Sequence, residues 1–190
     1  MYDGSNATAL RSRRWLGDAL VRLMERQRYP EITIGAICRE ADLSRQTFYN
    51  VFDSKEEVLR FYLRSRYETQ FDRFREQRAI TVGEIVEVFA VLVEENQQLL
   101  RRMVDNGLEG ILSDEMTRCV ALFGGRFVRK DRLGDTFPYS EVMVSGALGC
   151  LLIYWFRQEK PISIGQLTAL ITDFLEGRLF DLMAEEGKKT

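Results

Sequence analysis

The side chains best suited to recognise another molecule follow a tight turn in the first third of the chain. Ser44 can cap a short helix, and a group of polar residues follows it within two turns: Arg45, Gln46, Thr47, Tyr49 and Asn50. Arginine can donate two hydrogen bonds to guanine, and glutamine can pair with adenine in the same way. Phe48 and Phe52 fall on the opposite side of the segment and are expected to be core. The pattern predicts a helix that meets DNA on one side.

A second helix must hold this reading helix in place. Thr33 can cap a segment whose inward side holds Ile37 and small Cys38. Only Ala-Asp-Leu-Ser separates the two segments, which is too short for a flexible linker, and Asp42 tolerates the left-handed conformation of a tight turn. Two short helices at this spacing are typical of a helix-turn-helix.

Residues 32–59, ITIGAICREADLSRQTFYNVFDSKEEVL, resemble the DNA-binding segment of TetR-type (TetR/AcrR) repressors. The positions in register are Thr33, Ile37, Ala41, Ser44, Thr47, Phe48, Tyr49, Phe52, Ser54, Lys55, Glu56 and Leu59. Cys38, Asp42 and Val51 depart from the usual pattern. The resemblance implies that Lys55 approaches a DNA phosphate, and we expect Thr33 and Tyr49 to contact phosphates too. For Arg45 and Gln46, the alternative to reading bases is phosphate contact alone.

Composition and periodicity predict an all-α protein. The chain has only three prolines and no long alternating pattern. Residues 1–66 carry 12 basic and 9 acidic residues, whereas residues 67–190 carry 15 and 20. A mildly basic first third suits a DNA-binding unit. We therefore predict a three-helix head, residues 8–53, joined by a long helix to a helical regulatory and dimerisation body, residues 54–187.

The remaining helices are predicted from apolar spacing and caps. A first helix is expected over residues 8–27. Later helices are expected over residues 54–78, 82–105, 108–129, 138–158 and 163–183, with a mobile loop at 129–135. In TetR-type proteins the last two helices form a four-helix dimer interface. We expect a similar interface here, because these helices carry apolar and small side chains. The candidate interface residues are Ser145, Gly146, Gly149, Leu167, Ile171, Phe174 and Leu175.

Aromatic residues of the body are candidates for a ligand cavity. They are Tyr67, Phe71, Phe74, Phe89, Phe123, Phe127 and Tyr154. Such residues are more often plain core, but their number indicates that an effector would be small and apolar or aromatic.

Other classes of function find little support. The chain has no histidine, no glycine-rich phosphate loop and no nucleophile elbow, so we expect neither an enzyme, a metal site nor a cofactor. We expect the three cysteines, Cys38, Cys119 and Cys150, to be buried thiols of a cytoplasmic protein. The most apolar run, residues 142–156, is shorter than the roughly 20 residues that span a bilayer.

The sequence thus predicts a homodimeric, TetR-type transcription regulator that binds a palindromic operator. From the resemblance we expect a repressor that a small molecule releases, although activation stays open. The alternative is a helical protein-interaction module that has lost specific DNA binding.

Overall fold

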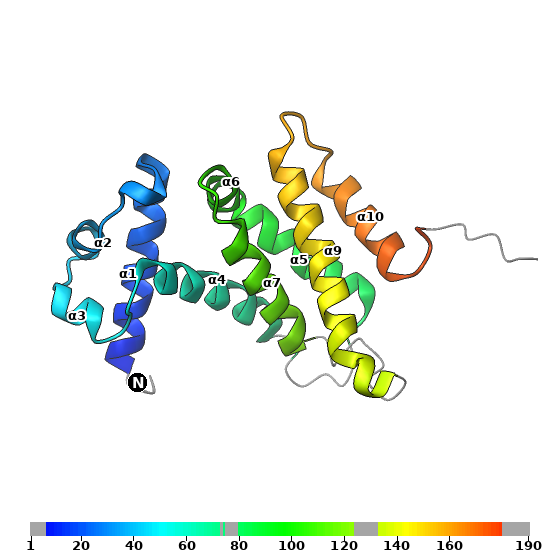
Figure 1. Cartoon of the computed structure of the whole chain (residues 1–190), viewed down its shortest axis with the longest axis horizontal. Coiled ribbons are helices and arrows are strands. Elements are labelled where there is room, and N and C mark those ends of the chain that lie inside the picture. Colours follow the sequence, from blue (N-terminus) through cyan, green and yellow to red (C-terminus); the bar gives the residue numbers. More distant parts are fainter. Residues whose placement is uncertain (1–6, 73, 75–79, 124–132, 180–190) are drawn as a thin grey trace, which may run out of the picture.

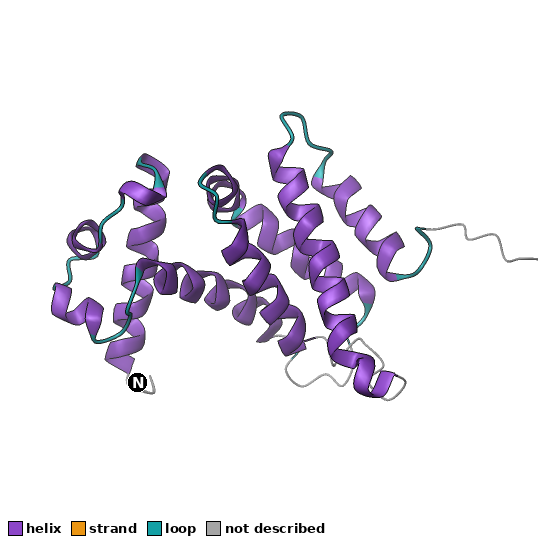
Figure 2. Ribbon diagram, viewed as in Figure 1, coloured by secondary structure: helices purple, strands orange, loops and turns teal. Residues whose placement is uncertain are grey.

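The computed structural model describes residues 7–72, 74, 80–123 and 133–179. Helices and turns account for the secondary structure of these residues, and no strand occurs among them. Figures 1 and 2 show a small group of helices at one end, one helix running away from it, and a larger helical group at the other end. The predicted all-α architecture with a helix-turn-helix is confirmed.

The first group, which we call the head, contains α1 (Ala7–Arg26), a short 3-10 helix η1 (Tyr29–Glu31), α2 (Ile34–Glu40) and α3 (Arg45–Tyr49). Its core consists of apolar side chains that α1 contributes at helical spacing, together with Ile37 and Phe48, all fully buried. Arg22 and Arg26 of α1 each form an ion pair with Glu40, at 2.9 and 2.8 Å, and so hold the end of α2.

The connecting helix is α4 (Lys55–Asp72). Two side chains cap its start: Ser54 Oγ accepts from the Glu57 N–H at 3.2 Å, and Glu57 Oε2 accepts from the Asp53 N–H at 2.8 Å. It packs against α1 of the head and against α5 and α7 of the body. The predicted extension beyond residue 74 lies outside the described residues.

The second group, the body, begins with a correction. One helix was expected over residues 82–105, but α5 (Val82–Glu95) and α6 (Gln97–Asp105) are separated at Asn96. The Asn96 side chain donates to the Leu92 carbonyl at 2.8 Å, and an asparagine that bonds its own backbone in this way competes with the helix. The end at Asn106 and Gly107 agrees with the prediction, since Gly107 has a φ of 72°.

The rest of the body comprises α7 (Glu109–Phe123), the 3-10 helix η3 (Gly134–Thr136), α9 (Phe137–Arg157) and α10 (Ile164–Leu175). Pro138 lies in the first turn of α9 and Ser163 caps α10, as expected. However, α10 stops at Leu175 and not near Met183, because Gly177 turns the chain with a φ of 74°. Most of the predicted 129–135 loop lies outside the described residues.

Within the body, α9 lies along α7 and α10 lies along α5 (Figure 1). Residues 134–157 are longer than the apolar run identified in the sequence. An 18-residue window within them has a mean hydropathy of 1.3, so this helix could cross a membrane by length and composition alone. A core helix of a soluble protein passes the same test. Leu148, Leu152 and Trp155 indeed pack in the core of this body.

Candidate functional site

The helix-turn-helix is set by local hydrogen bonds. Thr33 Oγ1 accepts from the Ala36 N–H at 3.1 Å and Ser44 Oγ accepts from the Thr47 N–H at 3.0 Å, so each helix begins at its predicted cap. Asp42 has a φ of 54°, which confirms that an aspartate can take the left-handed position of the turn.

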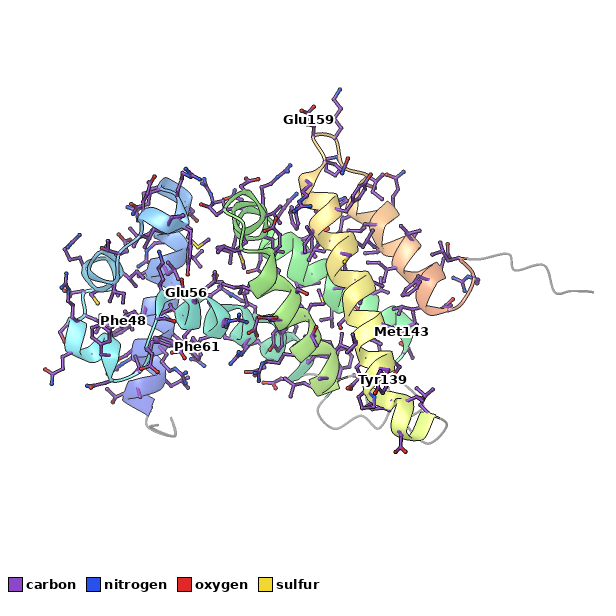
Figure 3. The ribbon with its side chains drawn as sticks, in the orientation of Figure 1. Phe48, Glu56, Phe61, Tyr139, Met143 and Glu159 are labelled. Atoms are coloured by element: carbon purple, nitrogen blue, oxygen red, sulfur yellow. The ribbon has the colours of Figure 1, made fainter. Side chains whose placement is uncertain are left out.

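Polar side chains of α3 face solvent while its apolar side chains face the core. Arg45, Gln46, Tyr49 and Asn50 are exposed, and Thr47 is half-buried beside Ser44, with 2.9 Å between the two hydroxyl oxygens. Phe48, which Figure 3 labels in the head, and Phe52 are both buried, as predicted. The structure therefore gathers donors and acceptors on one exposed side of a rigid helix.

Lys55 lies at the junction between the head and α4. Its Nζ donates to the carbonyls of Tyr29 and Ile32, at 2.8 and 3.0 Å, and lies 4.3 Å from the centre of the Tyr29 ring. These contacts give the lysine a structural role that the sequence did not indicate. Its contact with a DNA phosphate stays a prediction.

A buried carboxylate joins α4 to α7. Glu115 is 4% exposed, and its two oxygens accept from Arg64 at 2.8 Å each, from Arg60 at 3.3 Å and from the Tyr67 hydroxyl at 3.3 Å. The hydrogen bond to Glu115 raises the pKa of Arg64, while burial and the Glu115 charge raise the pKa of Tyr67. The sequence analysis missed this cluster because its members are far apart in the chain.

A cavity of about 140 Å³ lies between α4, α5, α7 and α9, close to this cluster. Its lining is almost wholly apolar; it includes the predicted Tyr67, Phe71 and Phe89, and also Leu148, Leu152 and Met116, which the sequence analysis did not select. Glu115 and Tyr67 belong both to the lining and to the ion-pair cluster. The cavity and the contacts between α4 and α7 therefore share these two residues.

Other predicted cavity residues are not part of this lining. Phe74 packs against Phe71, with 6.2 Å between ring centres. Tyr154 is 64% exposed, because it follows Leu152 by two residues and so lies on the other side of α9. Phe123 is the last residue of α7, and Phe127 lies outside the described residues.

The predicted dimer residues are mostly used inside one chain. Ser145 is buried beside Thr117 of α7, with 3.3 Å between their hydroxyl oxygens, and Gly149 lies against Met116 of α7. Leu167 and Ile171 are fully buried, and Leu175 lines the cavity. These side chains have little surface left for a partner, whereas Gly146 is exposed and Phe174 is half-buried.

Another set of residues lies on the exposed side of α9, and the dimer role of the predicted residues stays a prediction. The exposed side of α9 carries Tyr139, Val142, Met143, Gly146, Cys150 and Tyr154. Figure 3 labels Tyr139 and Met143 on this helix. Apart from the adjacent Val142 and Met143, these residues recur every three or four positions, which defines an apolar stripe, here called the α9 stripe.

The three cysteines differ from the expectation that all are buried. Cys38 is buried in the head and Cys119 lines the cavity, but Cys150 is exposed on the α9 stripe. Burial raises the pKa of Cys119 to about 12, and the Glu115 charge acts in the same direction. Its thiol is therefore protonated at neutral pH.

Comparisons with known proteins agree with the geometry of the head. Residues 16–60 match the family model described as bacterial regulatory proteins, tetR family. No curated protein sequence matches the chain. A solved TetR transcriptional regulator from Streptococcus agalactiae 2603V superposes with a TM-score of 0.58 at 16% identity, covering 88% of this chain and 95% of the other.

Two further solved structures are similar at the same 16% identity and 88% coverage of this chain. The dihydroxyacetone kinase operon activator DhaS gives a TM-score of 0.61 and is covered to 96%. The TetR family repressor AlkX from Dietzia sp. strain DQ12-45-1b, implicated in biodegradation of n-alkanes, gives 0.50 and is covered to 97%.

The head thus contains a helix-turn-helix, and α4 joins it to an all-helical body. Residues 16–60 are a head of the bacterial tetR family, and the chain has the fold of TetR-family transcription regulators.

Proposed function

We propose that this protein is a cytoplasmic, homodimeric regulator that binds a palindromic DNA operator. The observation that carries the proposal is the exposed polar side of α3, held by the Ser44 cap within a head of the tetR family. The candidate contacts are Thr33, Ser44, Arg45, Gln46, Thr47, Tyr49, Asn50 and Lys55. Residues 8–53 serve as the DNA-binding domain and residues 54–187 as the regulatory and dimerisation domain.

The dimer is proposed to form through the α9 stripe. Met143 is 74% exposed and Tyr139 is 73% exposed, and a continuous apolar surface of this kind is costly to leave in water. A two-fold axis beside α9 would bring the stripe of one subunit onto that of the other. Two heads related by this axis suit an inverted repeat.

The effector is proposed to be a small, uncharged, mainly apolar molecule bound in the cavity. The only buried acid of the described lining, Glu115, already accepts hydrogen bonds from Arg60, Arg64 and Tyr67, so it has no bond to offer an ionic group. A cationic ligand would therefore lose its hydration without gaining a partner. Arg66, the one basic residue of the described lining, is exposed and already donates to the Tyr62 hydroxyl at 2.7 Å.

The effector would act through α4. A ligand that moves Tyr67 or Glu115 changes the contacts of Arg60 and Arg64, which lie on the helix that enters the head. A shift of α4 would alter the spacing of the two heads and weaken operator binding. Repression released by the effector is the proposed outcome.

A genomic DNA selection with the purified protein tests this proposal. Enrichment of an inverted repeat, bound by two chains and more weakly at high salt, is the expected result. Transcription from a promoter that carries the enriched site then separates repression from activation. No enrichment over random DNA would overturn the regulator and favour the alternative, a helical interaction module without specific DNA binding.

A further inference from the structure

Gly35, in the second position of α2, faces the side chain of Arg45. A methyl group placed on Gly35 would lie 2.6 Å from Nη2 of Arg45 and 3.3 Å from its Cζ and Nε. Atoms at 2.6 Å overlap, so an alanine at this position would move the guanidinium away. The arginine therefore occupies space that is open only because residue 35 has no side chain.

The backbone gives no other reason for a glycine here. Gly35 lies inside a helix and its φ is not positive, and glycine is less favourable than alanine in such a position. The packing of the Arg45 guanidinium against Gly35 thus supplies an explanation that local conformation does not.

The arginine charge lies close to α2. Cys38, one turn after Gly35, has a pKa that burial raises and that the Arg45 charge lowers. Arg45 remains exposed, so its guanidinium rests on α2 while still facing solvent between α2 and α3. Thr33, the cap of α2 and another proposed DNA contact, lies two residues before Gly35.

We propose that Gly35 is a specificity-determining residue, which acts by allowing the Arg45 guanidinium to lie across the first turn of α2. This inference rests on the proposed function, because it concerns how the head reads DNA. The position of the guanidinium decides which base edge it reaches, and a bidentate contact with guanine requires a defined approach.

A double-mutant cycle tests the proposal. The full-length chain and its Gly35→Ala, Arg45→Ala and doubly substituted variants are each used to select from a library of randomised double-stranded DNA. Gly35→Ala should reduce the preference roughly tenfold at the same base pairs that Arg45→Ala affects. In the Arg45→Ala background it should change nothing, because the side chain that it displaces is gone.

Gly83→Ala provides the matched control, since Gly83 is also helical and its added methyl group meets nothing within 4 Å. Circular dichroism should show that both alanine variants fold, because the atom displaced by Gly35→Ala is the end of a flexible side chain.

Three results would overturn the role of Gly35. The first is that the Gly35→Ala variant keeps the base preference of the wild type, although Arg45→Ala changes that preference. The second is a Gly35→Ala protein that is unfolded in both backgrounds, which would make the glycine structural. The third is a wild type that selects no sequence, which would overturn the regulator proposal as well and so is distinguishable from the other two.

Discussion

The backbone N–H of Tyr29 donates a hydrogen bond of 3.0 Å to Oδ1 of Asn106. Tyr29 begins η1 in the head, while Asn106 ends α6 in the body, so the two parts are joined here as well as through α4. The Tyr29 carbonyl also accepts from Lys55, at the start of α4. The head therefore contacts α6 of the body directly, in addition to its link through α4.

Arg45→Ala and Gln46→Ala should each weaken binding to the enriched DNA site by about 1–3 kcal/mol, because a bidentate base contact is lost. Binding to random DNA should change much less. Fluorescence anisotropy with both DNAs measures the difference. Arg118→Ala, an exposed arginine of α7, is the control. Equal losses on both DNAs would mean that these side chains contact phosphates only.

Glu115→Gln should destabilise the fold by about 1–3 kcal/mol, since it removes the charge that Arg60 and Arg64 share. The cost stays below that of a fully buried pair because these arginines are 29% and 32% exposed. The neighbouring Asp114→Asn is the control, because Asp114 is 64% exposed and should cost less than about 0.5 kcal/mol. Urea unfolding followed by circular dichroism compares them, and similar losses would contradict a special role for Glu115.

The free energy of unfolding should fall as pH rises above 9. The pKa of Cys119 is about 12 in the folded chain, whereas the ordinary pKa of a cysteine thiol, expected in the unfolded chain, is 9.0. The folded state therefore keeps a proton that the unfolded chain releases. This contribution is fully present below pH 9 and is lost toward pH 12, by at most about 1.4 kcal/mol per pH unit. The free energy of unfolding, measured with urea between pH 7 and pH 10, should decline less steeply for Cys119→Ala than for the wild type. Parallel curves for the two proteins would show that the thiol does not contribute.

Val144→Phe should cost less than about 1 kcal/mol of stability, because Val144 borders the cavity and the larger ring can enter it. Val58→Phe, at a fully buried position of α4, should cost about 1–3 kcal/mol through overpacking. Urea unfolding measures both. Val144→Phe should also reduce the thermal stabilisation that apolar compounds give to the wild type, and an unchanged ligand response would place the effector elsewhere.

Met143→Arg should convert the dimer to a monomer without unfolding it, because the side chain is exposed within one chain and a charge on the α9 stripe would be buried against its copy. Sedimentation velocity measures the state. Trp15→Arg replaces another exposed apolar residue, on α1, and should leave the dimer intact. Dissociation by both substitutions would argue against a specific α9 interface.

The head could be predicted from the sequence because its structure depends on neighbours in the chain. Thr33 and Ser44 cap within three residues, and Asp42 turns the chain between them. The Gly35–Arg45 contact was not predicted, since it joins two helices and depends on side-chain direction.

The faces of the body helices could not be read in the same way. Helix α9 is apolar on most sides, so periodicity does not tell which side meets α7 and which remains uncovered. Ser145 and Gly149, which were expected at a subunit interface, lie beside Thr117 and Met116 of α7, and periodicity did not indicate this contact. The break at Asn96 and the end of α10 at Gly177 also depend on polar and glycine residues that a strong apolar pattern concealed.

The cavity should also make the stability of the body depend on hydrostatic pressure. Unfilled space in a core is volume that the chain gives up when that core opens, so hydrostatic pressure favours the opened state. A molecule that occupies the space removes this volume difference. Binding would therefore leave the body both more stable to heat and less sensitive to pressure.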